Sequence, residues 1–114
     1  MDVTLKLKYG SYPVSVQFDK YSANNRTALL FVHEDTSQTH ASINISHADV
    51  PDNDHIVVKA YSENAGMDSE LVRLGLIQPV PVGFVNSGFI TAPIHKLTPQ
   101  AIALRDEQFH AVGI

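Results

Sequence analysis

Apolar and polar residues alternate near the start of the chain in the way typical of paired β-strands. The alternation runs over residues 3–7 and, after Gly10, resumes over residues 14–18. Side chains two positions apart lie on the same face of a strand, so the pattern predicts a β-hairpin with one face in water. The unbroken apolar run at residues 28–32 then indicates a central, covered strand.

Two further strands are predicted before the middle of the chain. Residues 41–46 alternate again, with Ile43 and Ile45 pointing inward, after a loop at residues 36–40. Residues 55–61 contain three consecutive β-branched side chains, which suit a pleated and largely covered position.

A short amphipathic helix is predicted to follow this strand. Met67, Leu71 and Leu74 have the i, i+4, i+7 spacing of one helix face, and Gly75 is placed to end the helix. Asn64 or Ser62 can cap its start through a side-chain oxygen. Gly66 is unfavourable inside a helix, so the helix either begins after it or needs a bare backbone there.

The sequence after residue 77 predicts an extended arm and a second helix. Pro79 and Pro81 exclude a central strand at residues 78–82 and indicate an edge or arm. A tight turn with Gly88 at positive φ separates two further strands. Thr98 followed by Pro99 is a strong helix start, because threonine caps and proline fits the first helical position.

Together these elements predict an α+β fold in a single domain over residues 1–114. The expected order is β-β-β-β-β-α-β-β-α, with a mainly antiparallel sheet, one short central helix and one C-terminal helix. An antiparallel sheet is favoured because most connections between strands are too short for a crossover.

The amino-acid composition excludes several classes of functional site and partner. The chain has 114 residues, no cysteine and a net charge of −4. The absence of cysteine excludes a disulfide framework, a thiol nucleophile and a cysteine-ligated metal. The lysines and arginines are scattered, which argues against nucleic acid as a partner, and no stretch is long and apolar enough for a membrane span. We therefore expect a cytoplasmic protein without a cofactor.

The second half of the chain resembles small uncharacterised proteins encoded by phages and plasmids. The resemblance is carried by the segments YSENAGM (61–67), LVRLGLI (71–77), VNSGF (85–89) and PIHKL (93–97). The segment that contains Pro79 and Pro81 departs from that pattern. The resemblance implies an accessory protein of a mobile genetic element and carries over no catalytic residue.

Histidines near carboxylates could in principle hold a metal ion. His33 precedes two acidic residues, and His47 and His55 flank an Asp-rich turn. Imidazole nitrogens and carboxylate oxygens together bind zinc or manganese, so a metal-dependent hydrolase is one alternative. The spacing matches no helical His-x-x-x-His pair.

A protein-binding surface is the preferred hypothesis. Acidic side chains beside apolar and aromatic anchors have the composition of many interfaces. The expected binding residues are Glu63, Asn64, Met67, Asp68, Glu70, Phe84 and Phe89. We expect a non-enzymatic module that occupies the surface of a host protein, such as a defence or regulatory complex. A further alternative is a self-associating structural protein whose arm, residues 78–90, pairs across a twofold axis in a homodimer.

Overall fold

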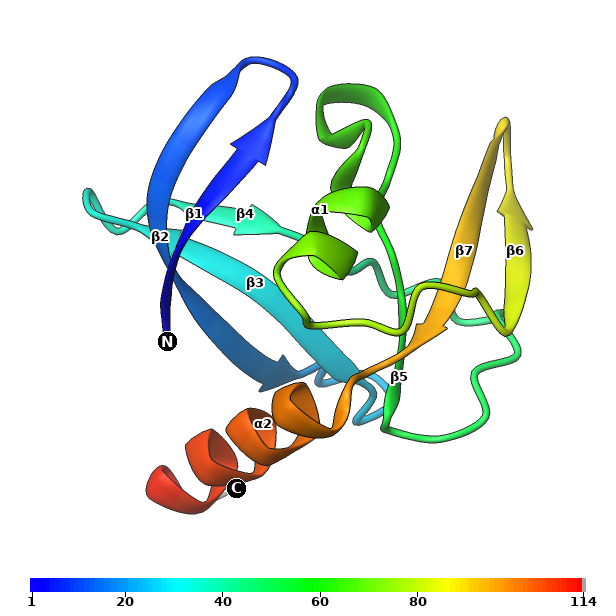
Figure 1. Ribbon diagram of the computed structural model, residues 1–114. Coiled ribbons are helices and arrows are strands. Elements are labelled where there is room, and N and C mark those ends of the chain that lie inside the picture. The colour runs from blue at the N-terminus through cyan, green and yellow to red at the C-terminus, as the bar shows by residue number, and fades with distance from the viewer. Residues whose placement is uncertain (114) are drawn as a thin grey trace.

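Residues 1–113 form two antiparallel sheets and two α-helices, which confirms the α+β prediction (Figure 1). The structure is a computed structural model that describes residues 1–113. The strands are β1 (Asp2–Leu7), β2 (Gly10–Lys20), β3 (Thr27–His33), β4 (Gln38–His40), β5 (His55–Val57), β6 (Gly83–Ser87) and β7 (Ile90–Lys96). The helices are the 3₁₀ turn η1 (Ser62–Asn64), α1 (Met67–Arg73) and α2 (Pro99–Ala111).

The first sheet has the order β1-β2-β3-β4 and contains the predicted N-terminal hairpin. β2 alternates strictly between buried and exposed side chains over Val14–Phe18, as expected for one wet face. β3 is covered over most of its length, with Leu29 and Phe31 fully buried. β2 is longer than β1, so its second half extends beyond the strand that pairs with it.

The second sheet has the order β5-β7-β6, so β7 is its centre and β6 an edge. A bridge between Ser42 and Val58 joins it to the first sheet. Here the structure differs from the sequence prediction: a strand forms at residues 38–40, and residues 41–46 contribute only that bridge. The guanidinium of Arg26 donates to the carbonyls of Ile45 and Ala48, which holds this segment in a turn.

The main hydrophobic core lies between the first sheet and the two helices. Its members come from every part of the chain: Leu5, Val14, Val16, Phe18, Leu29, Phe31, Ala41, Ile56, Val58, Met67, Leu71, Leu76, Ile77, Leu97 and Ala101. A smaller cluster on the second sheet is covered by the loop that contains Ile45 and Ala48. Residues on opposite faces of β5 serve the two clusters, Ile56 the main one and Val57 the smaller one.

Glycines set both ends of α1. Gly66 is its N-cap with φ of 91°, so the helix begins directly after this residue. Gly75 has φ of 74°, its N–H donates to the Val72 carbonyl, and the Leu76 N–H donates to the Leu71 carbonyl. These two bonds form a Schellman motif, which places Leu76 in the core.

The start of α2 also follows the prediction. The Thr98 hydroxyl accepts the Ala101 N–H at 3.2 Å, and Pro99 occupies the first turn. The same hydroxyl donates to the Gly75 carbonyl at 2.6 Å. One side chain therefore ties the end of α1 to the start of α2.

Candidate functional site

The seven expected binding residues differ in how far the structure exposes them. Phe84 and Phe89 are exposed on the β6–β7 hairpin, and Glu63 is exposed on η1. Asp68 is half-buried on α1. The other three side chains are buried: Asn64, Met67 and Glu70. The expected acidic rim beside apolar anchors is therefore not a continuous surface, and each buried residue has a structural role.

The side chain of Asn64 hydrogen-bonds to a backbone carbonyl at the outer edge of β4. Its Nδ2 donates to the carbonyl of His40 at 2.7 Å, and the side chain is only 4% exposed. It caps neither η1 nor α1, since neither helix start has a side-chain cap. The polar turn at residues 62–64 thus completes a strand edge 24 residues earlier in the chain.

The side chains of Glu70 and Arg73 hydrogen-bond to two backbone groups at the outer edge of β1. The Lys6 N–H donates to the Glu70 carboxylate, and Arg73 Nη2 donates to the Thr4 carbonyl at 2.8 Å. Arg73 also donates to both carboxylate oxygens of Glu70, from Nε to Oε1 at 2.6 Å and from Nη2 to Oε2 at 2.7 Å. The hydrogen bonds from Arg73 lower the pKa of Glu70 most, burial opposes them, and the Lys6 N–H adds to the lowering. The carboxylate therefore stays ionised although its side chain is 6% exposed.

Met67 belongs to the main core. It is fully buried at the first position of α1, beside Leu71 one turn later. The helical spacing that made it a candidate anchor is also the spacing of a core face, and the structure shows the latter.

The β6–β7 hairpin is the part of the predicted site that reaches solvent. Ser87 pairs with Ile90, which leaves Gly88 and Phe89 as a two-residue loop. Gly88 has φ of 61° and Phe89 does not share the positive φ, which is the pattern of a type II′ turn. This turn holds Phe89 at the tip of the hairpin, where its side chain is fully exposed.

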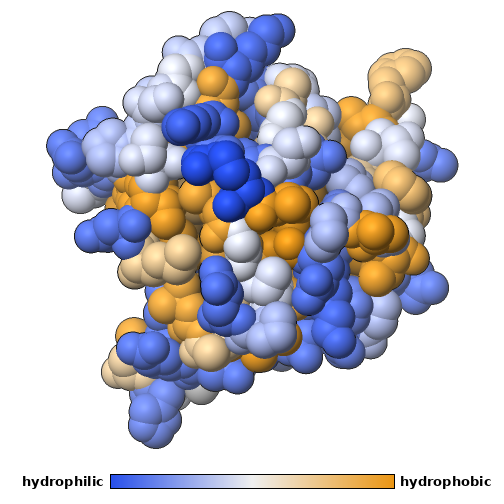
Figure 2. Space-filling view, in the orientation of Figure 1, coloured by the Kyte–Doolittle hydropathy of each residue, from blue (hydrophilic) through white to orange (hydrophobic). Residues whose placement is uncertain are grey.

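Four exposed apolar side chains gather in this segment. We call them the arm surface: Val80, Val82, Phe84 and Phe89. They are four of the seven large apolar side chains that are exposed among residues 1–113. Figure 2 shows apolar side chains at the right of the molecule, where Figure 1 places the hairpin.

The arm surface lies in the longest stretch of the chain without charge. No Asp, Glu, Lys or Arg occurs between Arg73 and Lys96, whereas 20 such residues occur in the whole chain. Depletion of charge with exposed aromatic side chains is the composition of an interface core. Reasoning from the sequence missed Val80 and Val82, and this charge-free stretch is the signal that could have found them.

Tyr9 is a second exposed aromatic residue in a hairpin loop, and its surroundings differ from those of Phe89. It occupies the second position of the two-residue loop between β1 and β2, the equivalent of Phe89 in the other hairpin. It is 70% exposed, but Lys8 lies over its ring at 5.5 Å from the centroid. An exposed aromatic turn residue is therefore not unusual by itself, and the charge-free surroundings distinguish Phe89.

The candidate metal ligands do not converge. The ring nitrogens of His33, His47 and His55 pair with Thr39, the Asn86 carbonyl and Asp52, respectively. Over residues 1–113, no group of three histidine or carboxylate side chains is placed to hold a metal ion. The spatial convergence that the hydrolase alternative needs is thus not found in this part of the chain.

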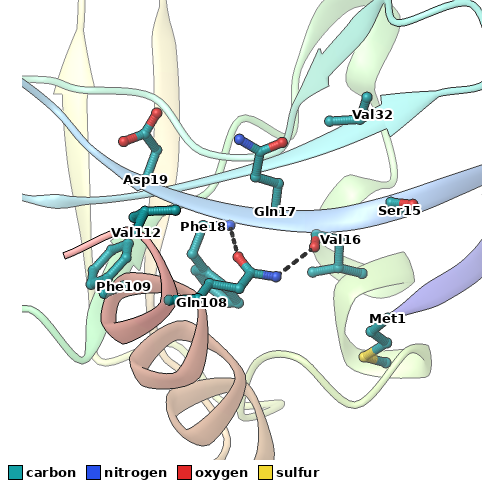
Figure 3. A pocket seen from close by; sticks show the side chains of 11 residues that line it. Met1, Ser15, Val16, Gln17, Phe18, Asp19, Val32, Gln108, Phe109 and Val112 are labelled. Carbon is teal, nitrogen blue, oxygen red and sulfur yellow. Dashed lines mark hydrogen bonds between the residues drawn. The ribbon is translucent and has the colours of Figure 1, made fainter. Parts of the chain in front are cut away.

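A groove of about 630 Å³ lies between β2 and the end of α2 (Figure 3). Gln108 spans it: its Nε2 donates to the Val16 carbonyl at 2.9 Å, and its Oε1 accepts the Phe18 N–H at 2.7 Å. The amide thus bonds to β2 where β1 no longer covers it, as a peptide group of an added strand would. Among the lining residues that the structure describes, Asp19 is the only one with a charged side chain.

No helix within residues 1–113 has the length and apolarity needed to cross a bilayer. Comparison with protein-family models, with curated proteins and with solved structures finds no match to the chain.

Proposed function

We propose that the protein is a non-enzymatic docking module that binds another protein through the arm surface, with Phe89 as its anchor. The observation that carries this proposal is a fully exposed phenylalanine on a tight turn within a charge-free segment. A tight turn fixes the backbone beneath the ring, so little conformational entropy is lost when the ring enters a pocket on a partner.

The energetics of interfaces support this assignment. A few buried aromatic side chains supply most of the binding energy in a typical interface, about 2 kcal/mol or more for each. The exposed side chains of Val82 and Phe84, which lie earlier on the same arm, add apolar area to such an interface. Exposed apolar side chains gathered in one segment mark interaction sites more often than isolated ones.

The resemblance to phage and plasmid proteins suggests the kind of partner. We propose a host protein, within a defence or regulatory complex, whose surface the module occupies. The partner surface should offer an apolar pocket and need not be basic, because the arm has no acidic residue to attract it.

The experiment compares three immobilised proteins: the wild type, Phe89→Ser and Tyr9→Ser. Serine is well tolerated in turns, so neither variant should disturb its hairpin. Each is incubated with lysate from candidate bacterial hosts, and bound proteins are quantified by mass spectrometry. A host protein captured by both the wild type and Tyr9→Ser should be depleted at least tenfold with Phe89→Ser.

Binding of that host protein is then measured with purified components. Loss of the Phe89 ring should weaken affinity by roughly thirtyfold, as expected for removal of a central aromatic anchor. Equal capture of every host protein by the wild type and Phe89→Ser would refute the proposal.

A further inference from the structure

Backbone groups at the outer edge of β6 are directed into solvent at Phe84. Phe84 pairs with Pro93 of β7, and proline has no N–H to exchange in a hydrogen-bonded pair. The Pro93 carbonyl instead accepts the Val58 N–H on the other side of β7, at 2.9 Å. Residues of an antiparallel pair that do not bond each other direct their N–H and C=O outward. The Phe84 peptide groups therefore face away from β7.

Asn86 confirms which side of β6 is the open edge. It lies two residues after Phe84, so its peptide groups face the same way. Its carbonyl accepts a hydrogen bond from the ring of His47 at 2.8 Å, from a loop outside the sheet. Within residues 1–113, the structure gives no such side-chain partner to the Phe84 N–H or C=O.

On each of the other exposed strand edges, at least one outward backbone group is bonded by a side chain from a helix or helical turn. Glu70 and Arg73 do this for β1, Gln108 for the second half of β2, and Asn64 for β4. An open edge is a template for pairing with another strand, and folded proteins usually protect it with such contacts or with charge. β6 has no charged residue, and its Phe84 side chain is 64% exposed.

We propose that β6 pairs with β6 of a second copy of this chain, antiparallel and across a twofold axis. The two Phe84 residues face each other as a hydrogen-bonded pair, each N–H donating to the other's carbonyl. Because one donor and one acceptor lie on the same residue, the edge is complementary to itself, as a twofold interface requires. This pair joins the two second sheets in the order β5-β7-β6-β6-β7-β5.

Charge favours a second copy at this edge over other parts of the surface. Each chain has a net charge of −4, and two copies repel wherever their charged surfaces approach. The arm is the longest stretch of the sequence without charge, so β6 itself adds no charge repulsion to such a contact. The antiparallel arrangement sends the two hairpin tips in opposite directions, so Phe89 of each copy stays available for another protein.

Two substitutions at Phe84 separate the backbone contribution from the side-chain contribution. Phe84→Thr removes the ring and keeps the N–H, and Phe84→Pro removes both. Proline is tolerated on an edge strand at a position that does not bond the neighbouring strand. Circular dichroism and thermal unfolding establish that each variant is folded.

Sedimentation over a range of concentrations measures association. The wild type should form a dimer, Phe84→Thr a weaker one, and Phe84→Pro should lower the association constant at least a further tenfold. A wild type that stays monomeric up to about 1 mM, the weak limit of useful affinities, would overturn the proposal. So would equal association of the proline and threonine variants.

A measurement on the wild type alone covers the case in which Phe84→Pro does not fold. Exchange of the Phe84 amide with deuterium should slow as protein concentration rises, whereas the exposed amide of Tyr9 should not respond. Exchange at Phe84 that is independent of concentration contradicts pairing at this edge. Phe89→Ser should dimerise like the wild type, so failure of host capture and failure of dimerisation are distinguishable.

Discussion

At the scale of single residues, polar side chains on helices complete hydrogen bonds that strands leave open. Gln108 is the clearest example, because its amide bonds both the Val16 carbonyl and the Phe18 N–H. Gln108→Ala should lower the free energy of unfolding by about 1 kcal/mol, since two backbone groups lose their partner beside an open groove. Urea unfolding measures the change. Gln100→Ala, at an exposed position of the same helix, is the control and should change stability by a few tenths of that.

The lowered pKa of Glu70 predicts that the stability of the folded protein depends on pH. Its pKa in the folded protein lies below the ordinary value of 4.5, chiefly because Arg73 donates to it. A lowered pKa stabilises the folded state above pH 4.5, and this contribution is lost as the pH falls through the folded-state pKa. Glu70→Gln should therefore flatten the decline in stability below about pH 4.5, relative to the wild type.

Thermal unfolding across pH 2.5 to 7 tests this, a span chosen to bracket the usual range of carboxylate titration. Glu63→Gln removes one carboxylate from a side chain that is 68% exposed, and serves as the control. A wild type and Glu70→Gln variant whose stabilities decline in parallel below pH 4.5 would contradict the assigned role of the Glu70–Arg73 pair.

At the scale of elements, glycine conformation fixes where α1 ends. Gly75→Ala should destabilise the protein by about 1–2 kcal/mol, because a side chain is disfavoured at positive φ. The added Cβ would also lie 2.8 Å from Gln100 Nε2, which must move. Gly83→Ala is the control: its φ is not positive and the nearest side-chain atom is 3.9 Å away. Comparable losses of stability in both variants would show that the left-handed backbone is not the cause.

The elements themselves were largely predictable from the sequence, whereas the site was only partly so. Alternation and capping signals are local, so the first hairpin, the central strand, Gly75 and the Thr98 cap could all be read directly. The burial of Asn64 and Glu70 could not, because their partners are backbone groups 24 and 64 residues away. In the sequence, a polar residue at a helix start has the same pattern whether its side chain caps that helix or hydrogen-bonds to a distant strand. The exposed Phe89 was identified, but the sequence could not separate it from the buried Met67.

At the scale of the whole molecule, charge controls how closely two copies approach. Each chain has a net charge of −4, while the proposed interface contains no charged residue. Raising sodium chloride from about 20 to 200 mM should therefore strengthen dimerisation several-fold, because the repulsion is screened and no interfacial ion pair is lost. Sedimentation at several salt concentrations measures this. Weaker association at high salt would indicate ion pairs between the copies and a different interface.

The hydroxyl of Thr98 lies at the base of the arm and has a consequence for motion. It joins the last turn of one helix to the first turn of the other, and the Thr98 N–H adds a bond to the Leu76 carbonyl. Neither helix terminus can fray without releasing the other. We therefore expect both termini to open together, as one cooperative unit.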